Sequence, residues 1–179
     1  MWSMPKTTTR TVRLDEDLDD TIQKRAKEEK VAVNFIINRT LRKFVEWDIP
    51  NQKFGAIMTP ERLLNKLIER YDDESCLELG RASAREDFKP LAEYLYAKFS
   101  PQTAIHLFRL ISHYGGYLDF DVVADLMDAR KQILILRHHQ GHKWGKYFQG
   151  LIEEVYQVLL GKAIKIECTD YVCVAQFEV

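Results

Sequence analysis

Three histidines with the chemistry of metal ligands lie within five residues of one another, in the stretch LRHHQGHKWGKY. His138, His139 and His142 carry imidazole nitrogens that bind zinc and other transition metals when a carboxylate or thiolate completes the site. The alternative is structural: a strand end and a helix start, in which His138 packs and Gly141 turns the chain. The sequence has no second ligand cluster with zinc-finger spacing. We therefore expect no cofactor, with a metal at the three histidines as the alternative.

The other candidates for chemistry are the cysteines and the catalytic motifs. Cys76, Cys168 and Cys173 are too few for a disulfide framework and are typical of a reducing compartment. We expect Cys168 and Cys173 to be free thiols at apolar strand positions, with a redox pair as the alternative if a hairpin places them opposite each other. The sequence contains no phosphate-binding loop, nucleophile elbow, HExxH or dinucleotide fingerprint. It therefore gives no support for an enzyme.

A second set of residues, with side chains that can contact DNA, alternates near the N-terminus in the stretch TTTRTVRL. Thr9, Thr11 and Arg13 fall on one face of a β-strand, and Arg10, Val12 and Leu14 fall on the other. Arginine bonds to guanine O6 and N7, and threonine offers a hydroxyl and a methyl to base edges. The first face is therefore suited to reading DNA, although a solvated face on a dimerisation arm is the alternative.

The elements that must position this strand are two helices. A run of acidic residues after Asp15, an N-cap, and basic residues near Lys30 predict a helix over 16–29 whose charges complement its dipole. A second helix is expected from Asn34, another N-cap, to a point before Pro50. Fewer than about 50 residues bury too little surface to fold alone. We therefore expect a homodimer in which two strands pair antiparallel and form a ribbon that fits the DNA major groove.

Residues 6–48 resemble the ribbon-helix-helix family of DNA-binding proteins, which includes the Arc and MetJ repressors. The segments TRTVRLDEDLDDTIQKRAKEEK and VAVNFIINRTLRKFVEW carry the resemblance. It implies that Thr9, Thr11 and Arg13 read bases and that the backbone of Val33 and Asn34 grips a phosphate at a helix N-terminus. The family often has a glycine between its helices, and this chain has none, so Lys30 or Val31 must adopt the turn conformation. Other phosphate contacts are expected from basic side chains: Lys6, Arg10, Arg39, Arg42 and Lys43.

The rest of the chain predicts an α+β domain over 60–179, joined by a linker over 49–59. Thr59 and Pro60, and again Ser100 and Pro101, are signatures of helix starts. Pro90 is expected to kink or divide a helix within residues 76–99. The order is three helices, two strands, a helix and a closing hairpin, which indicates an antiparallel sheet.

Residues 76–179 resemble the 4-vinyl-reductase-like domains, ligand-sensing modules related to the haem–nitric-oxide-binding fold. The segments LELGRASAREDF, YFQGLIEEVYQVLLGKAIKIEC and CVAQFEV carry this resemblance. Those domains often hold zinc through cysteines near their end, but the cysteine pattern differs here and the metal does not transfer. The domain also holds an aromatic cluster that is expected to pack as core, with a ligand pocket as the alternative: Tyr94, Tyr96, Phe99, Phe108, Tyr114, Tyr117, Trp144, Tyr147, Phe148 and Tyr156.

The predicted function is that of a homodimeric, sequence-specific transcriptional regulator with a sensing or oligomerisation domain. Its expected partners are double-stranded DNA and a small-molecule or metal effector. A net charge of -1 gives no overall case for nucleic acid, but residues 1–13 hold three basic side chains and no acidic one. The alternatives are the DNA-binding antitoxin of a toxin–antitoxin pair and a protein that uses the ribbon only to dimerise. With no apolar run of about 20 residues and no signal-peptide core, we expect a cytoplasmic protein without membrane contact.

Overall fold

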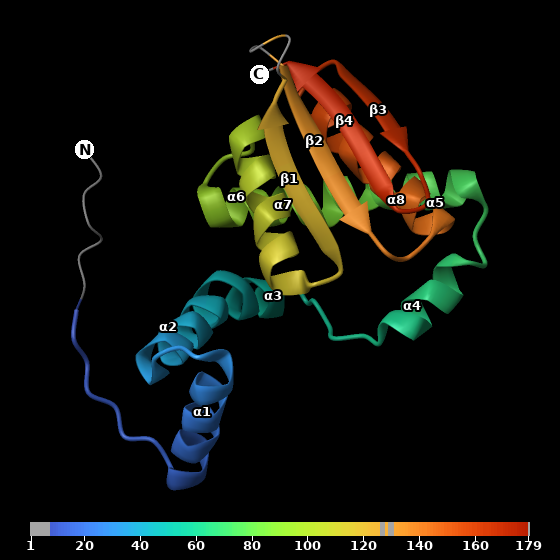
Figure 1. Cartoon of the computed structure of the whole chain (residues 1–179). Coiled ribbons are helices and arrows are strands. Elements are labelled where there is room, and N and C mark those ends of the chain that lie inside the picture. Colours follow the sequence, from blue (N-terminus) through green and yellow to red (C-terminus); the bar gives the residue numbers. More distant parts are fainter. Residues whose placement is uncertain (1–7, 126–127, 129–130, 179) are drawn as a thin grey trace. The chain divides into compact units, whose positions relative to one another are not determined.

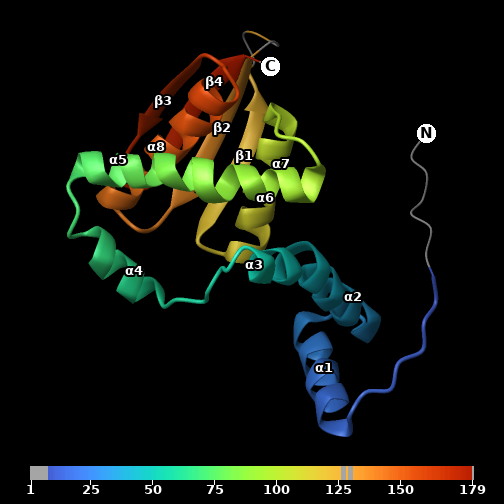
Figure 2. The ribbon, with the colours of Figure 1, turned by 180° about the vertical axis from the view of Figure 1, so that it is seen from behind.

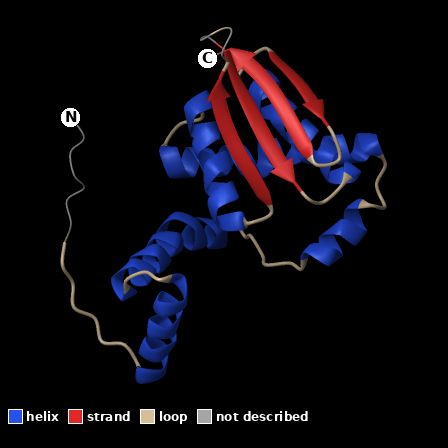
Figure 3. Ribbon diagram, viewed as in Figure 1, coloured by secondary structure: helices blue, strands red, loops and turns tan. Residues whose placement is uncertain are grey.

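The computed structural model describes residues 8–125, 128 and 131–178 (Figure 1). The chain forms two compact units, Met1–Glu46 and Trp47–Val179. The first is helical in its described part, and the second combines helices with an antiparallel sheet (Figure 3). The division falls two residues before the end of the predicted DNA-binding module.

The first unit contains two helices, α1 (Glu16–Glu29) and α2 (Val33–Lys43). Asp15 occupies the N-cap of α1, as predicted, and α1 ends where Lys30 adopts a left-handed conformation with φ of 56°. Lys30 therefore takes the turn position that glycine often fills. The prediction that Asn34 caps the second helix is wrong, because Ala32 is the N-cap and Asn34 lies in the first turn. The extended backbone of Ala32 places the N-cap of α2 two residues earlier than predicted.

Residues 8–15, which include the predicted strand, have no regular secondary structure in the single chain. The backbone at Asp15 is extended, with φ of -66° and ψ of 147°. A β-strand is defined by hydrogen bonds to a neighbour, and the neighbour expected here belongs to a second copy of the chain. The ribbon therefore stays a prediction.

The expectation that the second helix ends before Pro50 is wrong. Helical turns continue from Val33 through a π-helical segment, η1 (Phe44–Asp48), and a short α3 (Ile49–Lys53) that contains Pro50. Proline has no N–H for the carbonyl four residues back, and its ring crowds that carbonyl. A π-helical turn shifts the bonds to the residue five positions on, which relieves both problems.

The same arrangement occurs in the second unit. A helix over 73–96 passes through α5 (Asp73–Ser83), π-helical η2 (Ala84–Phe88) and α6 (Lys89–Tyr96), with Pro90 again two residues after the π-helical segment. Before it, α4 (Glu61–Ile68) has Pro60 at its N-cap, one residue later than predicted for Thr59. After it, α7 (Pro101–Gly115) begins with a capping box between Ser100 and Thr103, and left-handed Gly116 ends it.

The sheet of the second unit has four strands in the order β1-β2-β4-β3, all antiparallel. Hairpin β1 (Leu118–Ala124) and β2 (Lys131–His138) precedes α8 (His142–Glu153) and π-helical η3 (Glu154–Leu159). Hairpin β3 (Ile164–Cys168) and β4 (Val172–Glu178) closes the chain. The predicted α+β class with an antiparallel sheet is confirmed.

Helices cover one face of this sheet, and Figure 2, which looks onto that face, shows α5 and α6 crossing in front of the strands. Alternate strand residues such as Leu134, Leu136 and Phe177 point into the core, where they meet Phe108 and Phe148. Two glycines let α5 and α8 touch. A Cβ at Gly80 would lie 2.0 Å from the Tyr147 carbonyl oxygen, and one at Gly150 would lie 2.0 Å from that of Leu77. These helices therefore pack backbone against backbone.

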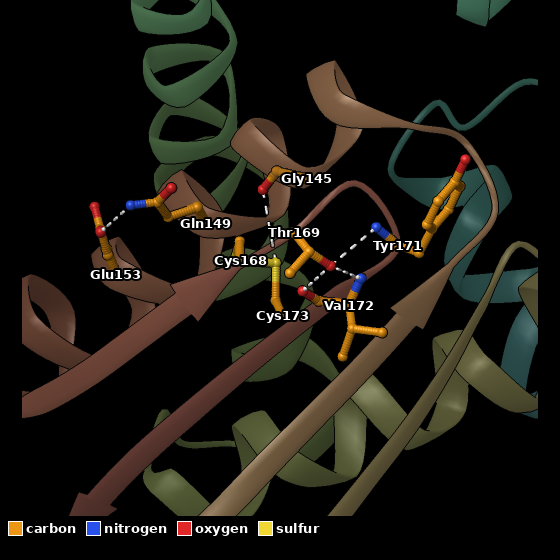
Figure 4. Close-up of a disulfide and its surroundings, with 8 residues drawn as sticks. All are labelled: Gly145, Gln149, Glu153, Cys168, Thr169, Tyr171, Val172 and Cys173. Atoms are coloured by element: carbon orange, nitrogen blue, oxygen red, sulfur yellow. Dashed lines mark hydrogen bonds between the residues drawn. A yellow bond between two sulfur atoms is a disulfide. The ribbon is translucent and has the colours of Figure 1, made fainter.

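The closing hairpin corrects the expectation about the cysteines. Cys168 and Cys173 are opposite residues of β3 and β4 and form a disulfide, drawn in Figure 4. The turn between them is held by Thr169, whose hydroxyl accepts from the backbone N–H of Val172 at 3.1 Å. Cys76 carries a free, buried thiol. The expectation of free thiols at these two positions is therefore wrong, and the alternative, a pair placed opposite each other by a hairpin, is observed.

Across the described parts of both units, none of the helices is long and apolar enough to span a membrane.

Candidate DNA interface and ligand cavity

The predicted base-reading side chains are all exposed. Thr9, Thr11 and Arg13 lie in the segment before α1, together with Arg10, and each is open to solvent. Lys6, a predicted phosphate contact, lies outside the described residues. The side chains needed for DNA contact are therefore accessible wherever the structure describes them.

The predicted phosphate clamp lies at the start of α2. Val33 and Asn34 are its first two residues, and the N–H groups of Phe35 and Ile36 both donate to the Ala32 carbonyl. The N–H groups of Val33 and Asn34 thus precede the first hydrogen bond of the helix. Such groups, together with the helix dipole, attract an anion.

Arg39 differs from the other predicted phosphate contacts. Its guanidinium makes a two-pronged ion pair with Glu29, with Nη1–Oε2 and Nη2–Oε1 distances of 2.8 and 3.1 Å, and lies 5.6 Å from the centre of the Phe35 ring. The hydrogen bond from Arg39 is the main cause that lowers the pKa of the Glu29 carboxyl. Arg39 therefore joins α1 to α2, and a phosphate would have to compete with Glu29.

The two basic residues near the end of α2 also have partners. Arg42 pairs with Glu46 one turn later at 3.0 Å, in an exposed ion pair of little energetic value. Lys43 also interacts within the chain. An exposed pair of this kind exchanges easily for a phosphate, so Arg42 stays suited to its predicted role.

The first unit leaves most of its apolar side chains uncovered. Among its described residues only Ala26 and Ile36 are buried. Val12 and Leu41 are 65% and 57% exposed, and Val45 is 60% exposed. Other large apolar side chains of this unit are exposed as well: Leu14, Leu18, Phe35 and Phe44.

The second unit contains a cavity of about 550 Å³ between its helices and the edge of the sheet. Its walls come from α4, from η2, from the end of α7 and from α8. A volume of roughly 300–1,000 Å³ is typical of small-molecule sites. The structure therefore gives the predicted aromatic cluster two roles: Tyr156 packs as core, while other members line the cavity: Phe108, Tyr117, Trp144, Tyr147 and Phe148.

Several polar side chains lie among the aromatic ones in the cavity wall. Gln140 contributes a side-chain oxygen that is buried and has no hydrogen-bond partner within the described residues. The indole N–H of Trp144 donates to Asn65 at 2.7 Å, which fixes the ring of this wall residue. Burial raises the pKa of the Tyr147 phenol, against a hydrogen bond with Ser83 that lowers it. The aromatic walls are therefore held in place by hydrogen bonds to neighbouring helices.

The three histidines are not brought together. His138 is fully buried on the inner face of β2, 5.0 Å from the Phe148 ring, and both of its ring nitrogens lack a partner among the described residues. Burial lowers the pKa of the His138 imidazole. His139 is exposed, and His142 is engaged elsewhere. Within the described ranges, no group of three His, Cys, Asp or Glu side chains is placed to hold a metal.

His142 instead bridges two carboxylates. Its Nε2 lies 2.8 Å from Asp73 and its Nδ1 lies 3.2 Å from Asp170, so α8 is tied to α5 and to the β3–β4 turn. Lys143 Nζ lies 2.6 Å from the same Asp73 carboxylate. Hydrogen bonds to Asp73 and then Asp170 raise the pKa of His142, while those from Lys143 and then His142 lower the pKa of Asp73 to about 2.

Reasoning from the sequence missed the carboxylates and the amide of the cavity. Glu61, Asp87 and Gln140 lie in separate segments, and nothing in their local sequence distinguishes them from solvated polar residues. Gly80 and Gly150 did leave a signal, because glycine inside a helix pattern often marks close packing.

Comparisons of this chain with protein-family models, with curated proteins and with solved structures found no match.

Proposed function

We propose that the protein is a homodimeric DNA-binding transcriptional regulator whose second unit binds an effector. The observation that carries the proposal is the uncovered apolar surface of the first unit. Only Ala26 and Ile36 are buried among its described residues, whereas Val12, Leu41 and Val45 are more than half exposed. A unit of this size needs a partner to bury such side chains, and a second copy of the chain supplies the same set.

In the proposed dimer, residues 9–14 of two chains pair as an antiparallel ribbon. Val12 and Leu14 then face the helices and leave the solvent, and Thr9, Thr11 and Arg13 point away from them. A ribbon of two strands fits the major groove, where arginine and threonine distinguish base edges. In this proposal, the apolar face of the strand serves dimerisation and the polar face reads DNA.

The proposed phosphate contacts surround this ribbon. The opening N–H groups of α2 at Val33 and Asn34 hold one phosphate, and Lys6, Arg10, Arg42 and Lys43 supply positive charge. Arg39 belongs chiefly to the α1–α2 junction, because Glu29 holds both arms of its guanidinium. We therefore expect Arg39 to act on stability more than on DNA affinity.

The second unit is proposed to sense a small molecule. Its cavity has the volume of a ligand site and aromatic walls, and its polar groups include an oxygen that lacks a donor. Ligand binding to this unit would alter how two ribbons are presented to DNA. Sensing is thus assigned to the cavity and not to the histidines, which lie apart.

The decisive experiment selects bound sequences from a random DNA pool and then compares two arginine variants. Arg13→Ala should cost roughly 1–3 kcal/mol on the selected site and little on unrelated duplex, as a base contact does. Arg42→Ala, the control at a proposed phosphate contact on α2, should weaken both duplexes about equally. If the protein selects no sequence, or if both variants lose affinity uniformly, base reading by Arg13 is wrong. A dimer without DNA affinity would indicate that the ribbon serves dimerisation only.

A further inference from the structure

We propose that the cavity of the second unit binds a small organic cation, a protonated or quaternary amine with an apolar body. This inference rests on the proposed sensing function of that cavity, and it adds the chemical class of the effector. Three properties of the lining support it: the aromatic side chains, the sign of the charged residues, and the kind of hydrogen-bonding group that has no partner.

The first argument is the aromatic lining. Trp144 and Tyr147 have ring centres 5.3 Å apart at an interplanar angle of 75°, and Trp144 and Phe148 have ring centres 5.9 Å apart. Trp47 and Tyr117 also belong to the lining. Aromatic faces attract cations through their quadrupole, and tryptophan does so most strongly. Several rings set at an angle to one another can surround a cationic head from more than one side.

The second argument is charge. The charged side chains in the described lining are Glu61 of α4 and Asp87 of η2, and the lining contains no Lys, Arg or His. Both residues are exposed, so their carboxylates lie where the cavity meets solvent. Neither forms an ion pair with another described residue. An entering cation would therefore meet two negative charges that no described side chain neutralises.

The third argument is the leftover hydrogen-bonding group. The unpartnered atom of the lining is Oε1 of Gln140, an acceptor, within the described residues. A buried acceptor without a donor is unfavourable, and a ligand N–H can supply the donor. An anionic ligand would instead be favoured by positive charge, and the described lining contains no Lys, Arg or His. Aromatic faces, carboxylates and a spare acceptor thus agree on a ligand that is positive and donates hydrogen bonds.

The test uses the full-length protein and three probes of similar size and different charge. These are phenyltrimethylammonium, its neutral isostere tert-butylbenzene, and benzenesulfonate. Titration calorimetry and the shift in melting temperature measure binding, because a ligand that binds only the native state stabilises it. Phenyltrimethylammonium should bind at least about tenfold more tightly than tert-butylbenzene, and benzenesulfonate should bind most weakly.

Two variants separate the charge of the cavity from its shape. The double substitution Glu61→Gln with Asp87→Asn should lower the affinity for the cation toward that for the neutral isostere but not down to it, because the aromatic rings still attract the cation. It should leave the affinity for the isostere unaffected. Glu86→Gln and Glu93→Gln remove exposed carboxylates from the helix that contains Asp87, outside the cavity lining. These control variants should change neither the affinity for the cation nor that for the isostere. As a second measurement on the unaltered protein, added salt should weaken binding of the cation and not of the neutral probe.

The outcomes distinguish this inference from the proposed function. If the neutral or anionic probe binds as well as the cation, the cationic class is wrong and the effector cavity stands. If none of the three binds, both the cationic class and effector binding by this cavity are wrong. The arginine variants test DNA reading separately, and failure there would leave the cation-binding result intact.

Discussion

The two units of this chain differ in how they bury apolar side chains. The second unit has a continuous core in which residues such as Phe108, Leu134 and Phe148 are buried between helices and sheet. The first unit buries only Ala26 and Ile36 among its described residues. The second unit therefore has the core of a domain that can fold alone, whereas we propose that the first is stabilised by association. The assembly of the protein should accordingly be sensitive to changes in the first unit, and its thermal stability to changes in the second.

The largest effect on stability is expected where α5 and α8 touch. Gly150→Ala places a methyl group 2.0 Å from the Leu77 carbonyl oxygen, so one helix backbone must move. We expect a loss of about 3 kcal/mol or more in the free energy of unfolding of the second unit. Urea unfolding followed by Trp144 fluorescence, in a variant with Trp2 and Trp47 replaced by phenylalanine, measures it.

The control is Gly161→Ala, where a Cβ meets open space but φ is +61°. This substitution should cost about 1 kcal/mol, the strain of a left-handed alanine. Equal losses for the two variants would show that α5 and α8 are not in backbone contact.

The next effect concerns association. Leu41→Ala removes an apolar side chain that is 57% exposed in the single chain and that we expect the dimer to bury. Each dimer loses two such side chains, each contributing roughly 1.5–3 kcal/mol when buried, so the dimer dissociation constant should rise more than tenfold. Sedimentation equilibrium measures this constant.

Leu79→Ala provides the matched control, because Leu79 is 44% exposed on α5 of the second unit. It should leave the dissociation constant unchanged. If Leu79→Ala weakens the dimer and Leu41→Ala does not, the second unit is the dimerisation surface and the comparison between units is reversed.

The smallest effect is a pH dependence of the second unit. Hydrogen bonds to Asp73 and Asp170 raise the pKa of His142, so its contribution to stability is present in full below the ordinary histidine pKa. That contribution is lost as the pH rises through the raised value. Because the site is exposed, we expect it to be less than about 1 kcal/mol. Melting temperatures between pH 5 and about pH 9 should show this slope, since histidine titrates in that region.

His142→Gln should remove this slope, the fall in stability above about pH 6.5, and His139→Gln, an exposed neighbour, should leave it. Below that pH the buried His138, whose pKa is lowered, contributes a slope of the opposite sign. At the acid end Asp73 behaves in the opposite way. Its pKa is lowered to about 2, so its stabilisation is present at neutral pH and is lost as the pH falls toward that value. A slope that persists in His142→Gln would show that another group titrates.

The sequence by itself determined features that depend on neighbours along the chain. The acidic start and basic end of α1, the Ser100–Pro101 helix start and the left-handed Gly116 follow from charge order, capping and turn chemistry. The four strands and their antiparallel class followed from alternation and turn residues. These signals lie within a few residues of the element they specify, so they can be read without knowing the fold.

Only the tertiary structure decided which distant residues meet. It paired Arg39 with Glu29, joined Cys168 to Cys173, and placed His142 between two carboxylates while burying His138. It also carried two helices through Pro50 and Pro90 by π-helical turns. The cavity depends in the same way on α4, η2, α7 and α8 meeting. These contacts are set by how elements pack against one another, and the sequence around a single residue does not specify which partner it meets.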